Sequence, residues 1–137
     1  MIRGLFGRKD SKEIKNTEST GSVVDTGVAP GIPGEITPAE VKKLLDEGKS
    51  LQIVDVREPQ EYAEARVEGS ALIPLGQLIG RLSELHKDQP VVAMCKSGNR
   101  SSVATSMLKR AGFNKVSNLK GGILAWIKSG LPVKRGR

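Results

Sequence analysis

The chain has 137 residues and a formal net charge of +7, from 22 Lys and Arg against 15 Asp and Glu. This length suits a single domain, and a hydrophobic content of 37% is enough to form its core. Aromatic residues make up only 3%, which leaves few side chains to stack on bases, so we expect no nucleic-acid partner. No apolar run approaches the ~20 residues of a membrane-spanning helix, and no membrane span is expected.

Cys95 is the only cysteine of the chain. The fold therefore cannot depend on an intramolecular disulfide, which suits a reducing compartment. The N-terminal residues also lack the apolar run of a secretory signal. We therefore expect a cytoplasmic protein in which Cys95 is a free thiol.

The chain is predicted to divide into three parts. Residues 1–34 are expected to form a flexible tail, because most of this stretch is rich in Ser, Thr, Gly, Lys and Glu and shows no apolar period. Residues 35–132 contain the apolar segments of one domain. Residues 133–137 form a short basic tail.

The first predicted helix follows residue 36. Thr37 is a suitable N-cap, Pro38 favours the first helical position, and Glu40 completes a capping box. Gly48 is placed to end the helix. Three apolar side chains then share one face of it: Val41, Leu44 and Leu45.

Four short apolar runs are predicted to be strands: residues 51–56, 71–74, 91–94 and 116–119. The first is nearly continuous in β-branched residues, which is typical of a strand covered on both faces. Each run is followed by a segment with helical spacing. This alternation predicts an α/β fold with a small, mostly parallel sheet flanked by helices on both faces.

The later helical segments are also expected to pack on the sheet through apolar faces. Their predicted apolar side chains are Leu78, Leu82 and Leu85 in the segment after residue 74, Val103, Ala104, Met107, Leu108 and Ala111 in the segment from residue 101, and Leu124, Trp126 and Ile127 after Gly121 and Gly122.

The loop after the 91–94 strand has features that stabilise an anion. Cys95 directly follows the strand, and helical spacing resumes at Ser101, so the thiol lies near a helix N-terminus. Backbone amides and the helix dipole favour negative charge there. With the added charge of Lys96 and Arg100, we expect the pKa of Cys95 to lie below the ~8.5 of a free cysteine.

Two further loop residues, Gly98 and Asn99, tolerate left-handed backbone and could let several amides turn inward as an anion-binding nest. The chain's single histidine, His86, lies at the polar end of a helical segment, so no histidine base is assigned. There is also no Cys and His cluster for zinc and no Gly-rich nucleotide loop. No metal and no cofactor are predicted.

Four segments together resemble the rhodanese family in the family's order and approximate spacing. The loop Cys-Lys-Ser-Gly-Asn-Arg-Ser at residues 95–101 is similar to the active-site loop of that family. The other three segments are residues 55–62, 73–75 and 118–126, and the resemblance covers about residues 35–132. One departure is clear: Ala65 and Arg66 stand where the family usually has a Gly-His pair.

The resemblance implies a rhodanese-like fold and sulfurtransferase activity. Cys95 would be the catalytic nucleophile. It would take a sulfur atom from thiosulfate or a similar small anionic donor, hold it as a persulfide, and pass it to cyanide or a thiol. The implied substrate-binding residues are those of the loop and the arginine after the 51–56 strand: Arg57, Lys96, Ser97, Gly98, Asn99, Arg100 and Ser101.

Two alternatives remain open at this point. The domain could be a sulfur carrier that takes sulfur from one protein, passes it to a thiol of another, and has little activity on small donors. Phosphatases that share the rhodanese fold also use a cysteine in an anion-binding loop. In their pattern five residues separate the cysteine from the arginine, whereas four separate Cys95 from Arg100.

Overall fold

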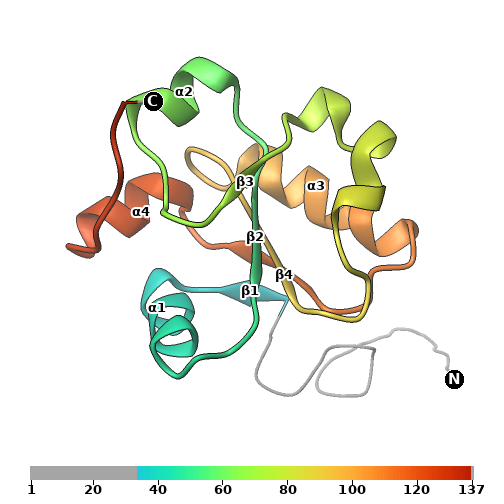
Figure 1. Ribbon diagram of the computed structural model, residues 1–137, viewed down its shortest axis with the longest axis horizontal. Helices are drawn as coiled ribbons and strands as arrows, with labels where there is room; N and C mark the ends of the chain where they lie inside the picture. Colours follow the sequence, from blue (N-terminus) through green and yellow to red (C-terminus); the bar gives the residue numbers. More distant parts are fainter. Residues whose placement is uncertain (1–33, 137) are drawn as a thin grey trace, which may run out of the picture. The chain divides into compact units, whose positions relative to one another are not determined.

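The computed structural model describes residues 34–136, which contain one five-stranded parallel sheet (Figure 1). The strand order is β1-β5-β4-β2-β3, and each neighbouring pair is parallel. The strands are β1 (Glu35–Ile36), β2 (Gln52–Asp55), β3 (Ala71–Leu72), β4 (Val91–Met94) and β5 (Val116–Leu119). The predicted α/β fold with its parallel sheet is confirmed. The predicted N-terminal tail, apart from Gly34, lies outside the described residues.

Helices cover both faces of the sheet, as Figure 1 shows. Thr37 and Glu40 form the predicted capping box of the first helix, and Gly48 follows the end of that helix with a φ of 79°. The helical elements are α1 (Pro38–Asp46), α2 (Pro59–Glu64), the 3₁₀ segments η2 (Leu75–Gln77) and η3 (Ile79–Glu84), α3 (Asn99–Arg110) and α4 (Gly122–Lys128).

The core has two halves, one on each side of the sheet. On β4, Val91 and Ala93 face one half, whereas Val92 and Met94 face the other, as the two-residue period of a strand requires. Side chains of α3 and the η segments complete the first half, which includes Cys95. Side chains of α1 and α4 complete the second. The loop that begins at Cys95 is therefore anchored from both faces.

The helical segments after residue 74 and from residue 101 each differ from the prediction in one detail. Residues 75–84 form two 3₁₀ segments instead of one regular helix, with a non-helical backbone at Arg81 (φ −125°, ψ 20°), although Leu78 and Leu85 are buried as expected. Gly76 and Gly80 weaken a regular helix there. Val103 was predicted to face the sheet but is 52% exposed.

The apolar face of α4 also differs from the prediction. Ile123 and Trp126 are buried, whereas Leu124 and Ile127 are 50% and 38% exposed. The helix has only 7 residues, too few for the sequence to show which of two adjacent apolar pairs faces the core.

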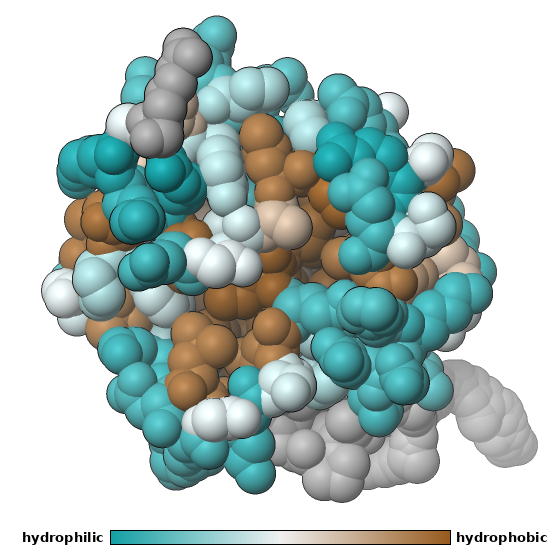
Figure 2. All heavy atoms as spheres, viewed as in Figure 1, coloured by the Kyte–Doolittle hydropathy of each residue, from teal (hydrophilic) through white to brown (hydrophobic). Residues whose placement is uncertain are grey.

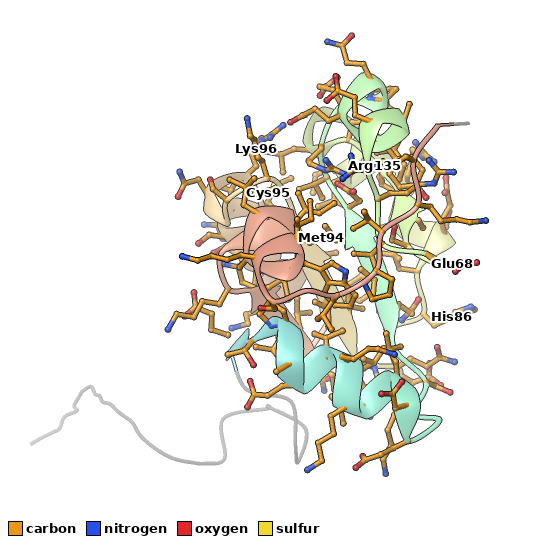
Figure 3. The ribbon with its side chains drawn as sticks, turned by 90° about the vertical axis from the view of Figure 1, so that its left-hand side faces the viewer. Glu68, His86, Met94, Cys95, Lys96 and Arg135 are labelled. Carbon is orange, nitrogen blue, oxygen red and sulfur yellow. The ribbon has the colours of Figure 1, made fainter. Side chains whose placement is uncertain are left out.

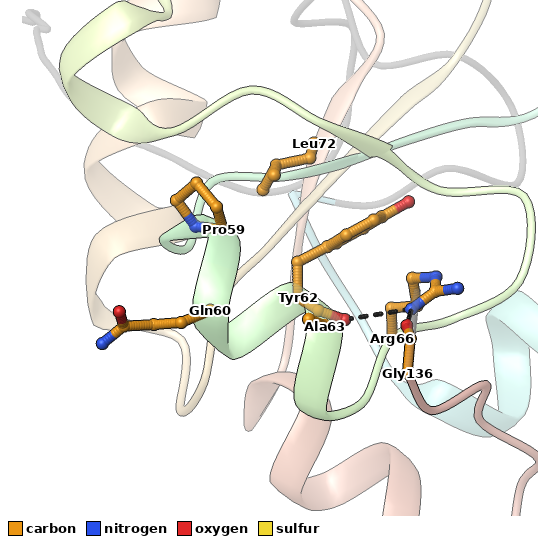
Figure 4. A pocket seen from close by; sticks show the side chains of 7 residues that line it. All are labelled: Pro59, Gln60, Tyr62, Ala63, Arg66, Leu72 and Gly136. Atoms are coloured by element: carbon orange, nitrogen blue, oxygen red, sulfur yellow. Dashed lines mark hydrogen bonds between the residues drawn. The ribbon is translucent and has the colours of Figure 1, made fainter.

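Residues after α4 run back along the end of α2, where Arg66 and Lys134 exchange two backbone hydrogen bonds of 2.8 Å. The guanidinium of Arg66 lies 5.2 Å from the centroid of the Tyr62 ring and donates to the backbone oxygens of Tyr62 and Gly136. These groups line a pocket of about 540 Å³ (Figure 4). Arg66, one of the two residues that depart from the family pattern, thus fastens the C-terminal segment.

Apolar side chains reach the surface in the middle of the face shown in Figure 2, with hydrophilic side chains around them. Within residues 34–136, the exposed large apolar side chains are Ile79, Val103, Leu124 and Ile127. None of the helices in this part of the chain has the length and apolar character needed to cross a bilayer.

Candidate active site

Cys95 lies at the carboxyl end of β4, the middle strand of the sheet, where ligands of open parallel sheets usually bind. Gly98 has a φ of 111° and caps α3, which begins at Asn99, two residues before the predicted start. Gly98 therefore adopts the left-handed backbone that the sequence predicted, whereas Asn99 is helical. Cys95 is only 1% exposed. Figure 3 shows Cys95 and Lys96 together, well apart from His86, which is exposed.

The sulfur of Cys95 is surrounded by hydrogen-bond donors. The amide of Gly98 lies 3.1 Å from Sγ, and the hydroxyl oxygen of Ser101 lies 3.3 Å from it. Burial raises the pKa of the Cys95 thiol, but the Ser101 hydroxyl and the amides of Ser101, Gly98 and Ser97 lower it by more. The pKa of Cys95 therefore lies below its ordinary value, as the sequence predicted. Hydrogen bonds from residues 97–101 are the main cause of this lowering.

Asn118 holds Ser101 in place through a hydrogen bond. The Ser101 hydroxyl lies 2.6 Å from Oδ1 of Asn118, on β5, and Nδ2 of Asn118 donates to the backbone oxygen of Gly98 at 3.3 Å. Sequence reasoning gave Asn118 no role. Its one available signal was its place at the end of a strand beside the cysteine strand, where side chains from both strands meet at one edge.

The N-terminus of α4 is hydrogen-bonded to the loop that begins at Cys95. The amide of Ile123 donates to the carbonyl of Cys95 at 2.9 Å, and the amide of Leu124 donates to the carbonyl of Lys96 at 3.1 Å. These bonds hold the two carbonyls toward α4, so the following amides of the loop are free to face the sulfur. The close approach requires Gly122, because a Cβ there would lie 2.5 Å from the Cys95 carbonyl oxygen.

Arg57 forms an ion pair with Asp55. Its Nε and Nη2 atoms donate to the carboxylate of Asp55 at 2.7 to 3.1 Å, Nη1 donates to the backbone oxygen of Glu61, and Nη2 also donates to that of Ala65. Arg57 is 4% exposed and Asp55 is fully buried. This guanidinium therefore holds the end of β2 against α2, and it also lines the pocket that Lys96, Leu124 and Ile127 border.

Arg100 is held by Glu61 of α2. Two parallel hydrogen bonds of 2.8 and 2.9 Å join the guanidinium to the carboxylate. The hydrogen bond from Arg100 is the main reason that the pKa of Glu61 falls to about 2, and the pKa of Arg100 is raised in turn. Arg100 also interacts electrostatically with Cys95, so Glu61 fixes a positive charge near the sulfur.

A family model for the rhodanese-like domain matches residues 37–129. The chain belongs to the rhodanese-like family. The four segments that resemble this family in the sequence all lie within the matched residues, and the loop that begins at Cys95 is one of them.

Three known proteins illustrate the similarity. The chain is 36% identical over 99 residues to a sulfurtransferase of Allochromatium vinosum, covering 72% of this chain and 92% of that protein. It is also 36% identical over 138 residues to a Mycobacterium tuberculosis protein named "Probable adenylyltransferase/sulfurtransferase MoeZ", of whose length it spans 35%. The crystal structure of a rhodanese-related protein from Thermoplasma volcanium has a TM-score of 0.67 at 31% identity, covering 73% of this chain and 96% of that chain.

In this rhodanese-like domain, the predicted site residues differ in their contacts and in their exposure. Ser97, Gly98, Arg100 and Ser101 interact with Cys95, whereas Arg57 binds Asp55. The exposed side chains of the loop are Lys96, Ser97 and Asn99. Residues 34–136 contain no group of three or more His, Cys, Asp or Glu side chains suited to a metal ion.

Proposed function

We propose that this protein is a sulfurtransferase in which Cys95 carries a sulfane sulfur as a persulfide. The Cys95 thiolate attacks the outer sulfur of thiosulfate, a new S–S bond forms, the old S–S bond breaks, and sulfite leaves with its electron pair. Cyanide or a thiolate then attacks the outer sulfur of the persulfide. Thiocyanate or a new persulfide leaves, and the Cys95 thiolate is restored.

The observation that carries this proposal is the set of donors around Sγ. A thiolate that accepts hydrogen bonds from Gly98 and Ser101 is stabilised without a protein base, and no histidine lies beside it. Since the chain has only one cysteine, no second thiol can attack the persulfide and form an internal disulfide. The sulfur must therefore leave to an outside acceptor, and a reducing cytoplasm would keep Cys95 ready for the next cycle.

We assign the charged residues different roles. Lys96 is exposed on the loop and Arg100 is partly exposed, so both are placed to attract an anionic donor and to stabilise departing sulfite. Arg57 acts as a positioning residue, because its ion pair with Asp55 fixes the strand end and its bonds to backbone oxygens fix α2.

One observation favours a protein as the acceptor. Leu124 and Ile127 of α4 are exposed and line, with Lys96 and Arg135, a pocket of about 200 Å³ next to the loop. Cyanide and thiosulfate have no apolar part to place there, whereas a thiol on a protein surface would bring apolar neighbours with it. This second candidate function is a carrier that passes sulfur between proteins through the same Cys95 persulfide.

Turnover with small substrates separates these functions. The assay measures thiocyanate formed from thiosulfate and cyanide by the wild-type chain and by Cys95→Ser, with Ser102→Ala, an exposed position on α3, as the control. The sulfurtransferase proposal expects turnover by wild type and the control and none by Cys95→Ser. Persulfidation without multiple turnover would favour the carrier. Cysteine-dependent release of phosphate from a phosphoester would instead contradict both.

A further inference from the structure

The Ser101 hydroxyl lies between two acceptors but has only one hydrogen to donate. Its oxygen is 3.3 Å from Sγ of Cys95 and 2.6 Å from Oδ1 of Asn118. Ser101 is fully buried and Asn118 is 8% exposed, so water hardly reaches this contact. Whichever acceptor loses the hydrogen is left with one donor fewer.

The orientation of the Asn118 amide is fixed by its other end. Nδ2 donates to the backbone oxygen of Gly98 at 3.3 Å. Turning the amide over would place Oδ1 against that carbonyl oxygen and Nδ2 against Ser101, losing the bond to Gly98. The carbonyl oxygen of Asn118 therefore faces Ser101 as an acceptor.

We propose that Asn118 is a positioning residue that competes with the Cys95 sulfur for the single hydroxyl hydrogen of Ser101. In the neutral state, the Cys95 thiol donates to the Ser101 oxygen, and the Ser101 hydroxyl donates to Asn118. When Cys95 loses its proton, the hydroxyl hydrogen turns to Sγ and Asn118 Oδ1 loses its donor. No covalent bond is made or broken in this exchange except the S–H bond of the thiol, whose proton goes to solvent.

This competition limits how far the loop can lower the thiol pKa. A thiolate that is stabilised more strongly is also a weaker nucleophile, because nucleophilicity falls with pKa. Asn118 would thus limit the lowering of the Cys95 pKa and preserve the reactivity of the thiolate. The effect on the reactivity of Cys95 rests on the proposed sulfurtransferase function. The competition of Asn118 and Cys95 for the Ser101 hydrogen does not.

The charged groups around Cys95 do not take part in the exchange. Arg100 of α3 interacts electrostatically with Cys95, and Arg100 in turn interacts with Glu61 of α2 and Asp55 of β2. Lys96 follows Cys95 on the loop, and Arg57 is bound to Asp55. Variants of Asn118 leave all of these charges in place.

The test is a pH titration of the Cys95 thiolate by its ultraviolet absorbance in the full chain. Because Cys95 is the only cysteine, the thiolate signal belongs to one site, and Cys95→Ser supplies the blank. The variants are Asn118→Leu, which has a similar size, and Asn118→Ala, which fits in the same space. Asn114→Ala, at an exposed position before β5, is the matched control.

We expect both Asn118 variants to lower the pKa of Cys95, raising the thiolate fraction about threefold to tenfold at a pH below the wild-type pKa. The lowering should vanish when Ser101→Ala is added, because the hydroxyl is then absent. A merely structural role would loosen the loop and raise the pKa instead. A raised or unchanged pKa in folded Asn118→Ala, or a lowering that persists with Ser101→Ala, would overturn the proposal. If Asn118→Leu does not fold, as judged by thermal unfolding, Asn118→Ala alone decides.

No sulfur donor is present in this titration. The titration therefore tests the role of Asn118 whether or not the protein transfers sulfur. The thiocyanate assay tests sulfur transfer whether or not Asn118 competes for the Ser101 hydrogen. The failure of one proposal can thus be told from the failure of the other.

Discussion

Gly122→Ala should displace the Cys95 loop, because the added methyl group would collide with the backbone of the loop where it packs on α4. The new Cβ would lie 2.5 Å from the carbonyl oxygen of Cys95 and 2.5 Å from the carbonyl carbon of Lys96, and both are backbone atoms that cannot rotate away. Gly122 also has a φ of 61°, which an L side chain rarely adopts. To accept the methyl group, α4 and the loop must move apart.

The expected cost follows from these contacts. Left-handed backbone costs an alanine about 1–2 kcal/mol. Separation of α4 from the loop weakens two hydrogen bonds, Ile123 N–H to Cys95 and Leu124 N–H to Lys96, worth about 0.5–1.5 kcal/mol each. We therefore expect Gly122→Ala to lower the free energy of unfolding by about 2–5 kcal/mol. A displacement of the sulfur by about 1 Å should also lower turnover on the order of a hundredfold.

Gly48→Ala is the matched control, because Gly48 has a φ of 79° but nothing within 4 Å of the position that the added methyl group would take. It should carry the backbone strain alone, about 1–2 kcal/mol, and retain wild-type turnover. Chemical denaturation measures the stability of both variants, and the thiocyanate assay measures activity under conditions where each is folded. Equal stability losses and equal turnover in the two variants would refute the role of the α4 contact.

Three further predictions concern the polar groups of the site. Ser101→Ala should raise the pKa of Cys95 by about 1, since a hydrogen bond to a charged group contributes about 1.5–3 kcal/mol and part of it is shared with Asn118; thiolate absorbance against pH measures this. Glu61, whose pKa is lowered from 4.5 to about 2, adds stability that is fully present above pH 4.5 and is lost as the pH falls toward 2, so Glu61→Gln should flatten the pH dependence of unfolding in that range. Arg57→Gln should lower the free energy of unfolding by about 3–5 kcal/mol, because it leaves the buried Asp55 carboxylate without its partner.

Each of these variants has a control at an exposed position of the same residue type: Ser102→Ala, Glu64→Gln and Arg110→Gln. A Ser101→Ala chain with the wild-type thiol pKa would contradict the role of hydrogen bonds in lowering the pKa of Cys95. If Glu61→Gln leaves the pH dependence of unfolding at acidic pH unchanged, the ion pair between Glu61 and Arg100 adds no stability. If Arg57→Gln is as stable as its control but needs more thiosulfate to reach half its maximal rate, then Arg57 binds the donor after all.

The sequence was most informative where a local pattern determines the structure. The capping box at Thr37 and Glu40 and the apolar runs of β2 and β4 predicted elements that the structure contains, because caps and strand periods are local properties. The position of Cys95 at a strand end followed from the same patterns. Strand β1, by contrast, has two residues, too few to show any period.

The remaining features depend on distant contacts that no local pattern encodes. Arg57 follows a strand end on the ligand side of the sheet, which suggested an anion-binding role, and the sequence did not show that Asp55 would be its ion-pair partner. Asn118 reaches Ser101 and Gly98 beside Cys95 because β5 and β4 are neighbours in the sheet. Glu61 reaches Arg100 across 39 positions of sequence. Such pairings arise from tertiary structure.

Transfer of a sulfur atom to Cys95 is tested most directly by intact-protein mass spectrometry after incubation with thiosulfate. Wild-type protein should gain the mass of one sulfur atom, cyanide should remove that mass, and Cys95→Ser should gain nothing. An unmodified wild-type chain, or the same gain in Cys95→Ser, would contradict the proposed persulfide at Cys95.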